Sequence, residues 1–251
     1  MADDIGDRFK AYEGCFDYSL PRRVPMVIRV DGRGFHGLTL AKPFDNLFFA
    51  HMAHVAAALC KEIQGSVLAY FQSDEISIVA RDDMQPNTEA WVGKRLSKVV
   101  SLSAAVATAT FNEWSGLHRQ FASRAFVLPD LSEVTNYLIW RQQDATRNSV
   151  SMAAHAAFSH KSLHGVNSNG MIDRLREAGK PWEETPTHFK RGAVCKPVVV
   201  FKVVPQTGMM CERREWQIDM EPPIFTQDRA YVEALYRQPE SVPVLDRTKE
   251  R

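Results

Sequence analysis

The sequence has little cysteine and no long apolar run, and these two absences exclude several classes of protein. Its four cysteines, Cys15, Cys60, Cys195 and Cys211, lie far apart and form no Cys-x-x-Cys pair. A disulfide-rich secreted domain or a zinc ribbon needs closely spaced pairs. No stretch approaches the roughly 18 uninterrupted apolar residues of a membrane span, and the first residues do not resemble an export signal. We therefore expect a cytoplasmic protein with reduced thiols and no membrane partner.

The sequence also lacks a surplus of charge of either sign. Its 31 basic and 30 acidic residues give a net charge of +1. This balance neither requires nor excludes a nucleic-acid partner, because a binding surface can be local. With 251 residues, 45% of them hydrophobic, the chain is long enough to bury one large core. One large domain with an extension is the expected organisation.

The first half of the chain alternates short apolar runs with longer helical patterns. The run over residues 24–30 is β-branched and bounded by Pro21 and by glycines, which indicates a buried strand that ends at Asp31. The elements expected after it are a helix over 44–63, a hairpin of strands over 67–71 and 76–80, a helix over 91–111 and a strand over 121–128. The Val and Thr content of 91–111 leaves a strand there as the alternative. This β-α-β-β-α-β order is typical of an antiparallel four-stranded sheet with both helices on one face.

The second half of the chain is expected to be less regular. The elements predicted there are a helix from Leu131 towards His155, a loop-rich region over 165–186, an apolar strand over 198–204 and a turn at 206–208. We therefore predict a mixed α/β fold, of the α+β type, in which the sheet is followed by a mainly helical extension and a C-terminal hairpin.

Acidic side chains and glycines gather where two predicted strands end. Asp31 closes the first strand, and Asp74 and Glu75 lie in the hairpin bend. The first strand is the expected neighbour of this hairpin, so the three carboxylates should converge. Like charges a few Å apart repel unless a cation neutralises them, and Mg²⁺ prefers oxygen ligands. The pattern predicts a magnesium site, and the glycines at 32 and 34 let the backbone approach a ligand.

Carboxylates that bridge metal ions to phosphates suit two-metal phosphoryl transfer, for which basic residues should face the same cleft. Lys42 follows the glycine-rich loop, and Arg95 and Lys98 share one helix face, so the three are candidates for a triphosphate clamp. Each motif alone has a plainer interpretation, as a turn, a solvated bend or a solvated helix face. The combination, not any single motif, favours a metal site.

Five segments, taken in order, resemble a known family. The segments "VIRVDGRGFH", "KPFD", "QSDE", "KRLSKVVS" and "YLIWRQQDATRNS" resemble the tRNA-histidine guanylyltransferase superfamily of 3′-to-5′ nucleotide-adding enzymes, over roughly residues 20–195. The resemblance implies a palm like that of polymerases and nucleotide cyclases, over residues 1–134. Residues 135–251 would be a helical, finger-like extension with a C-terminal hairpin, packed with the palm as one unit. The usual assembly implied is a homotetramer, a dimer of dimers.

The resemblance also assigns roles to single residues. Asp31 and Asp74 would bind two Mg²⁺ ions, the Gly32 carbonyl would be an extra ligand, and Glu75 would be a supporting catalytic acid. The residues implied around the nucleotide are Gly32, Arg33, Gly34, Phe35, His36, Lys42, Asp45, Ser73, Arg95, Lys98, Asn148, Lys190 and Arg191. We expect RNA to lie along the second half of the chain, where basic side chains are supplied by Arg119, Arg124, Arg141, Arg147, His160, Lys161, Lys190 and Arg191. In the same half, Trp140 and Trp182 either stack on bases or pack in the core.

One block departs from the eukaryotic members of the family. They have His-Ile-Asn-Asn-Leu-Tyr-Asn where residues 146–152 of this chain read Thr-Arg-Asn-Ser-Val-Ser-Met. Without that block, the chain resembles the Thg1-like branch of the family, whose members repair 5′-truncated tRNAs against a template. The implied activity is Mg²⁺-dependent, template-directed addition of NTPs to the tRNA 5′ end, after 5′-adenylylation by ATP. Two alternatives stay open, namely a nucleotide cyclase with the same palm and a catalytically idle protein that only shields tRNA ends.

Overall fold

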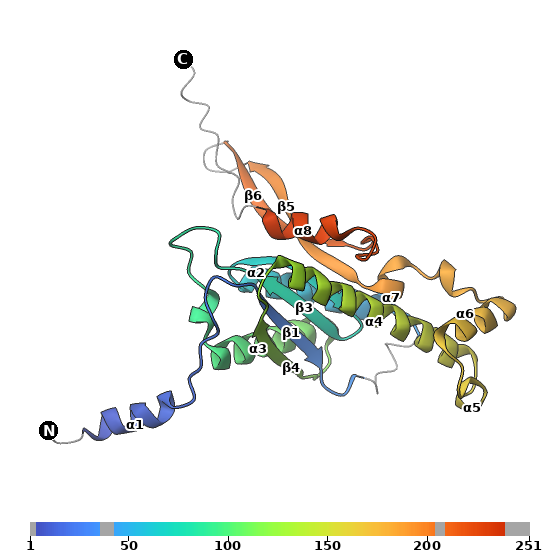
Figure 1. Cartoon of the computed structure of the whole chain (residues 1–251), viewed down its shortest axis with the longest axis horizontal. Coiled ribbons are helices and arrows are strands. Elements are labelled where there is room, and N and C mark those ends of the chain that lie inside the picture. Colours follow the sequence, from blue (N-terminus) through green and yellow to red (C-terminus); the bar gives the residue numbers. More distant parts are fainter. Residues whose placement is uncertain (1–3, 36–42, 204–208, 239–251) are drawn as a thin grey trace, which may run out of the picture.

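A computed structural model describes residues 4–35, 43–203 and 209–238, and these residues contain one six-stranded antiparallel sheet (Figure 1). The strands are β1 (Met26–Gly32), β2 (Ser66–Gln72), β3 (Glu75–Ala80), β4 (Phe121–Val127), β5 (Ala193–Val203) and β6 (Met210–Asp219), in the spatial order β4-β1-β3-β2-β5-β6. The predicted α/β class and β-α-β-β-α-β order are confirmed. The sheet is larger than the four strands expected, because β5 pairs with β2 and brings β6 with it.

Two helices cover one face of the sheet, as predicted. α2 (Asn46–Glu62) begins where the Asp45 carboxylate accepts a hydrogen bond of 2.9 Å from the Phe48 amide, and it buries Met52, Val55 and Leu59 at helical spacing. α3 (Leu96–Ser115) packs beside it and ends at Gly116. Their apolar sides meet the even-numbered residues of β1, so this face forms the larger core.

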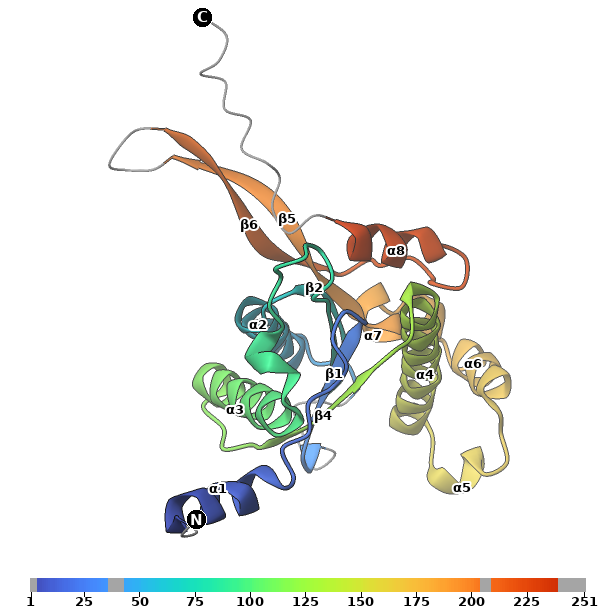
Figure 2. The same ribbon diagram turned by 60° about the vertical axis from the view of Figure 1, so that its left-hand side comes forward.

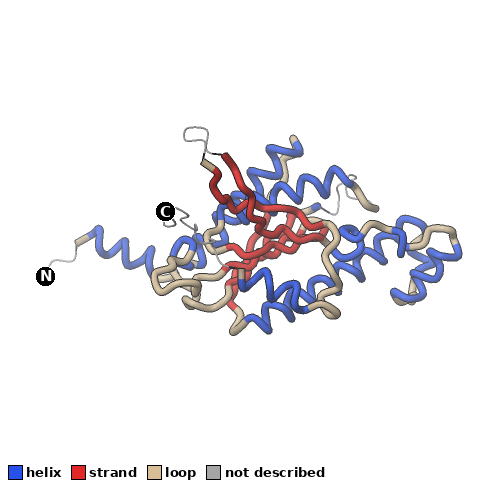
Figure 3. The backbone as a smooth tube through the Cα atoms, turned by 90° about the horizontal axis from the view of Figure 1, so that it is seen from above, coloured by secondary structure: helices blue, strands red, loops and turns tan. Residues whose placement is uncertain are grey.

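The opposite face is covered by α4 (Leu131–Ala157) and α8 (Arg229–Arg237), so helices flank the sheet on both sides (Figure 3). Val27 of β1 belongs to the core on this side, together with Leu138 of α4 and Val232 of α8. Side chains alternate between the faces of a strand. Asp31, four residues after Val27, therefore points to the α4 side. No helix in the described ranges is long and apolar enough to cross a lipid bilayer.

The region expected to be loop-rich contains helices, so that prediction is wrong for much of 165–186. The Asn167 side chain caps α6 (Ser168–Glu177) by accepting from the Gly170 amide at 2.9 Å, and Leu175 of α6 is buried. Short amphipathic helices carry few apolar residues, which makes their periodicity hard to distinguish from a loop. The remaining elements are α1 (Ile5–Gly14), α5 (His160–Leu163), α7 (Thr187–Arg191), and the 3₁₀ turns η3 (Trp91–Lys94) and η4 (Trp182–Glu184).

The other boundaries differ in smaller ways. β5 starts at Ala193, five residues before the predicted start at 198, while the predicted turn at 206–208 lies outside the described residues. The helix predicted over 91–111 is divided by a left-handed segment, with φ of 46° at Val92, before α3 starts. The division of the chain into residues 1–134 and 135–251 falls inside α4 and stays a prediction.

In Figure 2, α1 and the distal part of the β5–β6 hairpin extend away from the body.

A buried ion pair fixes the left-handed segment before α3. The Lys94 side chain is 1% exposed, and its ammonium donates to the Asp82 carboxylate at 2.9 Å and to the carbonyl of Val24 at 2.8 Å. Arg22 donates to the other Asp82 oxygen at 2.6 Å. Burial alone raises the pKa of Asp82, but the hydrogen bonds from Lys94 and Arg22 outweigh it, so the net pKa lies below the usual value.

Asp82→Asn is expected to lower the free energy of unfolding by about 3 kcal/mol at pH 7, since it leaves the Lys94 ammonium buried without a counter-charge. Because the folded-state pKa of Asp82 is depressed, its stabilisation is complete above the unfolded-state pKa and is lost as the pH falls through the folded-state value. Urea unfolding at pH 7 and below pH 4 measures both effects. Asp173→Asn, at an acid that is 63% exposed, is the control and should change little; equal losses for the two variants would contradict the assignment.

Candidate active site

The end of β1 is tied to the β2–β3 turn, as the sequence predicts. The Gly32 amide donates a hydrogen bond of 3.0 Å to the Asp74 carbonyl. Asp31 lies directly opposite Glu75 in the pairing of β1 with β3. Directly opposite residues carry their side chains on the same face, with Cβ atoms about 5 Å apart. The two carboxylates therefore lie together on the α4 side, beside the turn that holds Asp74.

The glycine-rich loop after β1 is shaped by Phe35, whose side chain is 3% exposed. Its ring packs 5.1 Å from the rings of both Phe111 and Phe121. A Cβ at Gly32 would lie 2.4 Å from the Phe35 ring, so a larger residue at this position would displace the Phe35 side chain. The aromatic side chain predicted near the nucleotide is thus a core residue, and it holds the loop in place.

Two arginines neutralise Glu75. The Arg141 guanidinium lies 2.8 Å (Nε to Oε1) from the Glu75 carboxylate and donates from Nη2 to Oε2 at 3.1 Å. Arg29 approaches the same carboxylate at 3.7 Å. Burial raises the pKa of Glu75, and both guanidinium groups oppose this effect. Among the described residues, no group of three His, Cys, Asp or Glu side chains is arranged to hold a metal ion. Glu75 is therefore held by cations in a supporting position, and the metal ligands predicted at Asp31, Gly32 and Asp74 stay a prediction.

The oxygen atoms predicted to bind a metal ion are the carboxylates of Asp31 and Asp74 and the carbonyl of Gly32. Asp31 Oδ1 is buried and has no hydrogen-bond partner among the described residues, and the Arg124 guanidinium lies 3.5 Å from it. An unsatisfied buried carboxylate oxygen is costly unless a cation or another donor satisfies it. All three donors are hard oxygens, which Mg²⁺ prefers, and two carboxylates leave room for water and phosphates. The residues present therefore fit a Mg²⁺ site.

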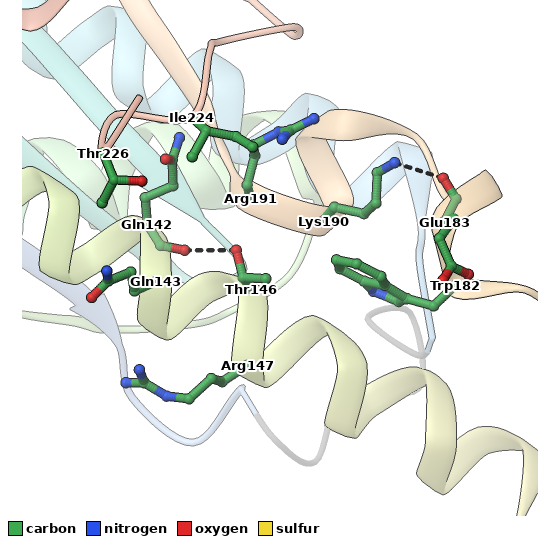
Figure 4. A pocket seen from close by; sticks show the side chains of 10 residues that line it. All are labelled: Gln142, Gln143, Thr146, Arg147, Trp182, Glu183, Lys190, Arg191, Ile224 and Thr226. Atoms are coloured by element: carbon green, nitrogen blue, oxygen red, sulfur yellow. Dashed lines mark hydrogen bonds between the residues drawn. The ribbon is translucent and has the colours of Figure 1, made fainter. Parts of the chain in front are cut away.

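A cleft of about 640 Å³ lies between α4, η4, α7 and the segment before α8 (Figure 4). Gln142, which lines it, directly follows Arg141 on α4, so one helix forms a wall of the cleft and holds Glu75. The Trp182 indole lines the cleft too, and its N–H donates to the Ser149 hydroxyl at 3.0 Å. The cations that line the cleft are Arg147, Lys190 and Arg191. The cleft thus offers positive charge and one fixed aromatic ring.

Lys190 and Arg191, both predicted around the nucleotide, differ in the contacts that their side chains make. The Lys190 ammonium donates to the Glu183 carbonyl at 2.7 Å, as Figure 4 shows. Arg191 Nε is buried without a hydrogen-bond partner, while the Arg191 carbonyl accepts from the Tyr70 hydroxyl at 2.8 Å. Asn148, which is also predicted around the nucleotide, follows Arg147 on α4 and is exposed. Arg191 lines the cleft and forms no ion pair with an acid of the described residues, so its charge can bind an anion there.

A smaller cavity of about 40 Å³ brings Asp45 and Ser73 together. Ser73 adopts a left-handed φ of 51° in the turn, and its hydroxyl lies 3.3 Å from the Asp74 carboxylate. His188 also lines this cavity, with both ring nitrogens buried and unpaired, and burial lowers the pKa of its imidazole. The sequence carried no signal for His188, because a histidine inside a short helix has no distinctive spacing.

Other predicted site residues are placed elsewhere. Arg95 pairs with Asp17, and Lys98 follows it in the first turn of α3. The preceding residue, Lys94, contacts Val24, which lies about 20 Å of extended chain from Asp31. Within one chain, then, the first turn of α3 and the acids lie at opposite ends of β1. Arg33 and Gly34 lie exposed in the loop after β1, while His36 and Lys42 fall outside the described residues.

Arg141 was expected to face RNA, but its side chain is 9% exposed and its guanidinium is paired with acids. The sequence shows that Arg141 is basic but not which way its side chain points from the helix. Trp140, beside it, is 48% exposed and does not pack in the core. Arg147 remains 55% exposed and is the α4 cation that faces the cleft.

Comparisons with known proteins agree with this geometry. The family model described as tRNAHis guanylyltransferase matches residues 6–131. A structure described as a bacterial tRNA(His) guanylyltransferase (Thg1)-like protein in complex with ATP is 38% identical, with a TM-score of 0.83, and covers 94% of this chain and 100% of that one. A probable tRNA(His) guanylyltransferase from Drosophila melanogaster is 32% identical over 71% of this chain and 68% of its own length.

A further relative, a probable tRNA(His) guanylyltransferase from Dictyostelium discoideum, is 27% identical over 80% of this chain and 86% of its own length. The matches therefore extend over the palm and into the second half of the chain. They agree with the family resemblance that the acidic, glycine-containing and arginine-containing motifs of the sequence indicate. The chain belongs to the tRNAHis guanylyltransferase family of nucleotidyltransferases.

Proposed function

We propose that this chain adds nucleotides to the 5′ end of tRNA in the 3′-to-5′ direction, as a Mg²⁺-dependent, template-directed enzyme of the Thg1-like branch. The observation that carries the proposal is the hydrogen bond between the Gly32 amide and the Asp74 carbonyl, which brings the end of β1 and the β2–β3 turn together. The family membership supports tRNA as the substrate. The bacterial relatives in complex with ATP and with GTP support NTPs as the second substrate.

The metal site proposed consists of Asp31, Asp74 and the Gly32 carbonyl, which would hold two Mg²⁺ ions. When bound there, divalent cations neutralise the charge that develops on a transferring phosphoryl group. Glu75 supports this arrangement through its ion pair with Arg141, which fixes the start of β3 next to Asp31. The protein's own part is to hold the acids in register and to place cations around the phosphates.

The reaction proposed has two phosphoryl transfers. The 5′-monophosphate of the RNA first attacks the α-phosphorus of ATP and releases pyrophosphate. The 3′-hydroxyl of an NTP then attacks the activated 5′-phosphate, so that a new phosphodiester forms and AMP leaves. Both steps need the same charge stabilisation, so one pair of carboxylates can serve them in turn. Arg147, Lys190 and Arg191 would bind the phosphates that enter the cleft between α4, η4 and α7.

The roles of the other residues predicted around the nucleotide remain a proposal. Asp45 and Ser73 line one cavity beside the acids, which supports a role for both. Arg95 and Lys98 lie at the other end of β1, so a contact with a nucleotide at the acids of the same chain has no support here. A homotetramer also stays a proposal, supported by exposed apolar side chains along α1 such as Phe9 and Tyr12. A cytoplasmic location rests on the cysteine pattern alone.

The direct test incubates the purified protein with ATP, all four NTPs, Mg²⁺ and a tRNA that lacks its 5′-terminal nucleotide. We expect a product one nucleotide longer at its 5′ end, with the added base complementary to the opposite strand, and no product with EDTA. Growth at the 3′ end would contradict the proposal. Cyclic nucleotide formed without RNA would identify a cyclase, and RNA binding without any product would identify an idle binding protein.

A further inference from the structure

A second, basic groove lies at the sheet edge farthest from β1, and the reaction proposed above does not use it. The groove has a volume of about 700 Å³ and runs between the last turns of α2 and the β5–β6 hairpin. Its charged lining residues are the basic Lys61, Lys202, Arg213 and Arg214 and the acidic Glu215. Against a net charge of +1 for the whole sequence, this is a local concentration of positive charge.

The cations of the groove differ in how they are held. Lys202 forms an ion pair with Glu215, and Arg214 donates to the Ser66 carbonyl at 3.0 Å. Lys61 and Arg213 are exposed, and neither forms an ion pair with an acid in the part of the chain that the structure describes. Two positive charges are therefore free to bind an anion, beside one guanidinium that is already fixed in place.

The shape of the groove suits a polymer backbone. Its α2 side is formed by Ala57 and Ala58, whose small side chains let a ligand approach the helix closely. The opposite wall includes Trp216, which is partly buried against the core, with the Arg214 guanidinium 5.2 Å from the centre of its ring. The walls are thus formed by a helix and by side chains packed on the sheet, while the unpaired cations Lys61 and Arg213 are exposed.

The position of the groove excludes a nucleotide that also reaches the acids. Asp31 and Glu75 point to the α4 side of the sheet, whereas α2 covers the other side. From β1 to β6 the sheet order gives four steps between neighbouring strands, or about 19 Å at about 4.8 Å per step. Figure 2 shows α2 and the hairpin on the side of the molecule away from α4. A ligand that contacts both regions must be long and carry negative charge along its length.

We infer that this groove binds the sugar–phosphate backbone of the tRNA body, away from the end at which nucleotides are added. The inference rests on the proposed function for the identity of the RNA. Regularly spaced phosphates match free cations on a concave surface, and each neutralised phosphate releases counterions, so binding is salt-dependent. A second copy of this chain is the rival occupant, and the test below separates the two.

The test compares Lys61→Gln/Arg213→Gln with the unchanged protein on two RNA probes. One probe is a full-length tRNA that lacks its 5′-terminal nucleotide, and the other is a short acceptor-stem hairpin with the same end. For the full tRNA we expect the Kd to rise about tenfold at low salt, and the slope of log Kd against log salt to fall by about 2. The short hairpin, which does not reach the groove from the acids, should keep its Kd within about twofold.

The matched control is Arg237→Gln, at an exposed arginine on α8 that pairs with Glu233. Circular dichroism and sedimentation check the fold and the mass of each variant. An unchanged Kd for full tRNA overturns the inference, and so does an equal loss on the short hairpin or in the control. A changed mass would assign the groove to a contact between copies. If the unchanged protein extends neither RNA but shows the predicted difference in binding, the proposed function fails while the groove stands.

Discussion

Asp31→Ala and Asp74→Ala are each expected to lower nucleotide addition by about a thousandfold or more, because each removes a carboxylate from the proposed metal site. The loss should appear in the rate of the chemical step in single-turnover experiments. The Kd for tRNA should stay within about twofold, since the RNA-binding cations lie elsewhere. The stability of Asp31→Ala should not fall, because Asp31 Oδ1 is buried without a hydrogen-bond partner among the described residues and its removal relieves repulsion with Glu75.

A readout that does not depend on activity is thermal unfolding with and without Mg²⁺. A metal that binds the folded state raises the Tm, and this rise should be smaller in both aspartate variants than in the unchanged protein. Asp173→Ala, at an exposed acid on α6, is the matched control and should retain both the activity and the rise. If either aspartate variant extended RNA at the normal rate, the metal assignment would be wrong.

The part of the site that the sequence predicted depends on local pattern. The run of β-branched residues before Asp31 and the alternation around "QSDE" specify two strands and a bend, and a β-α-β-β-α-β order leaves few ways to arrange them. The pairing of Asp31 with Glu75 then follows from a strand lying next to a hairpin. Asp45 was predicted near the nucleotide from its motif, and the structure shows that it caps α2.

The part that the sequence could not predict depends on contacts between distant segments. Arg141 lies 66 positions from Glu75, and the spacing of charges along α4 does not reveal which of its arginines turns inward. The pairing of β5 with β2 is similar, since an apolar strand near the end of a chain has no local signal for its neighbour. Arg95 is a third example, because the helix that follows it was predicted but the position of its first turn, at the far end of β1 from the acids, was not.

Arg141→Met is expected to lower both activity and stability. It leaves the Glu75 carboxylate, which is 21% exposed, without its main counter-charge, and should cost about 3 kcal/mol of unfolding free energy. Glu75 would shift to find other partners, and a displacement of about 1 Å at the acids lowers the rate by about a hundredfold. The effect should appear in kcat more than in the KM for tRNA, because Arg141 is buried and does not face the RNA.

Two further variants separate the orienting role of Arg141 from its contribution to stability. Arg141→Lys keeps the charge but loses the two-pronged contact with Glu75, so it should recover stability better than rate. Arg141→Met/Glu75→Gln removes both charges, so it should regain most of the stability and little of the rate. The control, Arg237→Met on α8, should change neither. A double variant that recovered full activity would mean that the Arg141–Glu75 pair serves the fold alone, since the acids would then keep their positions without it.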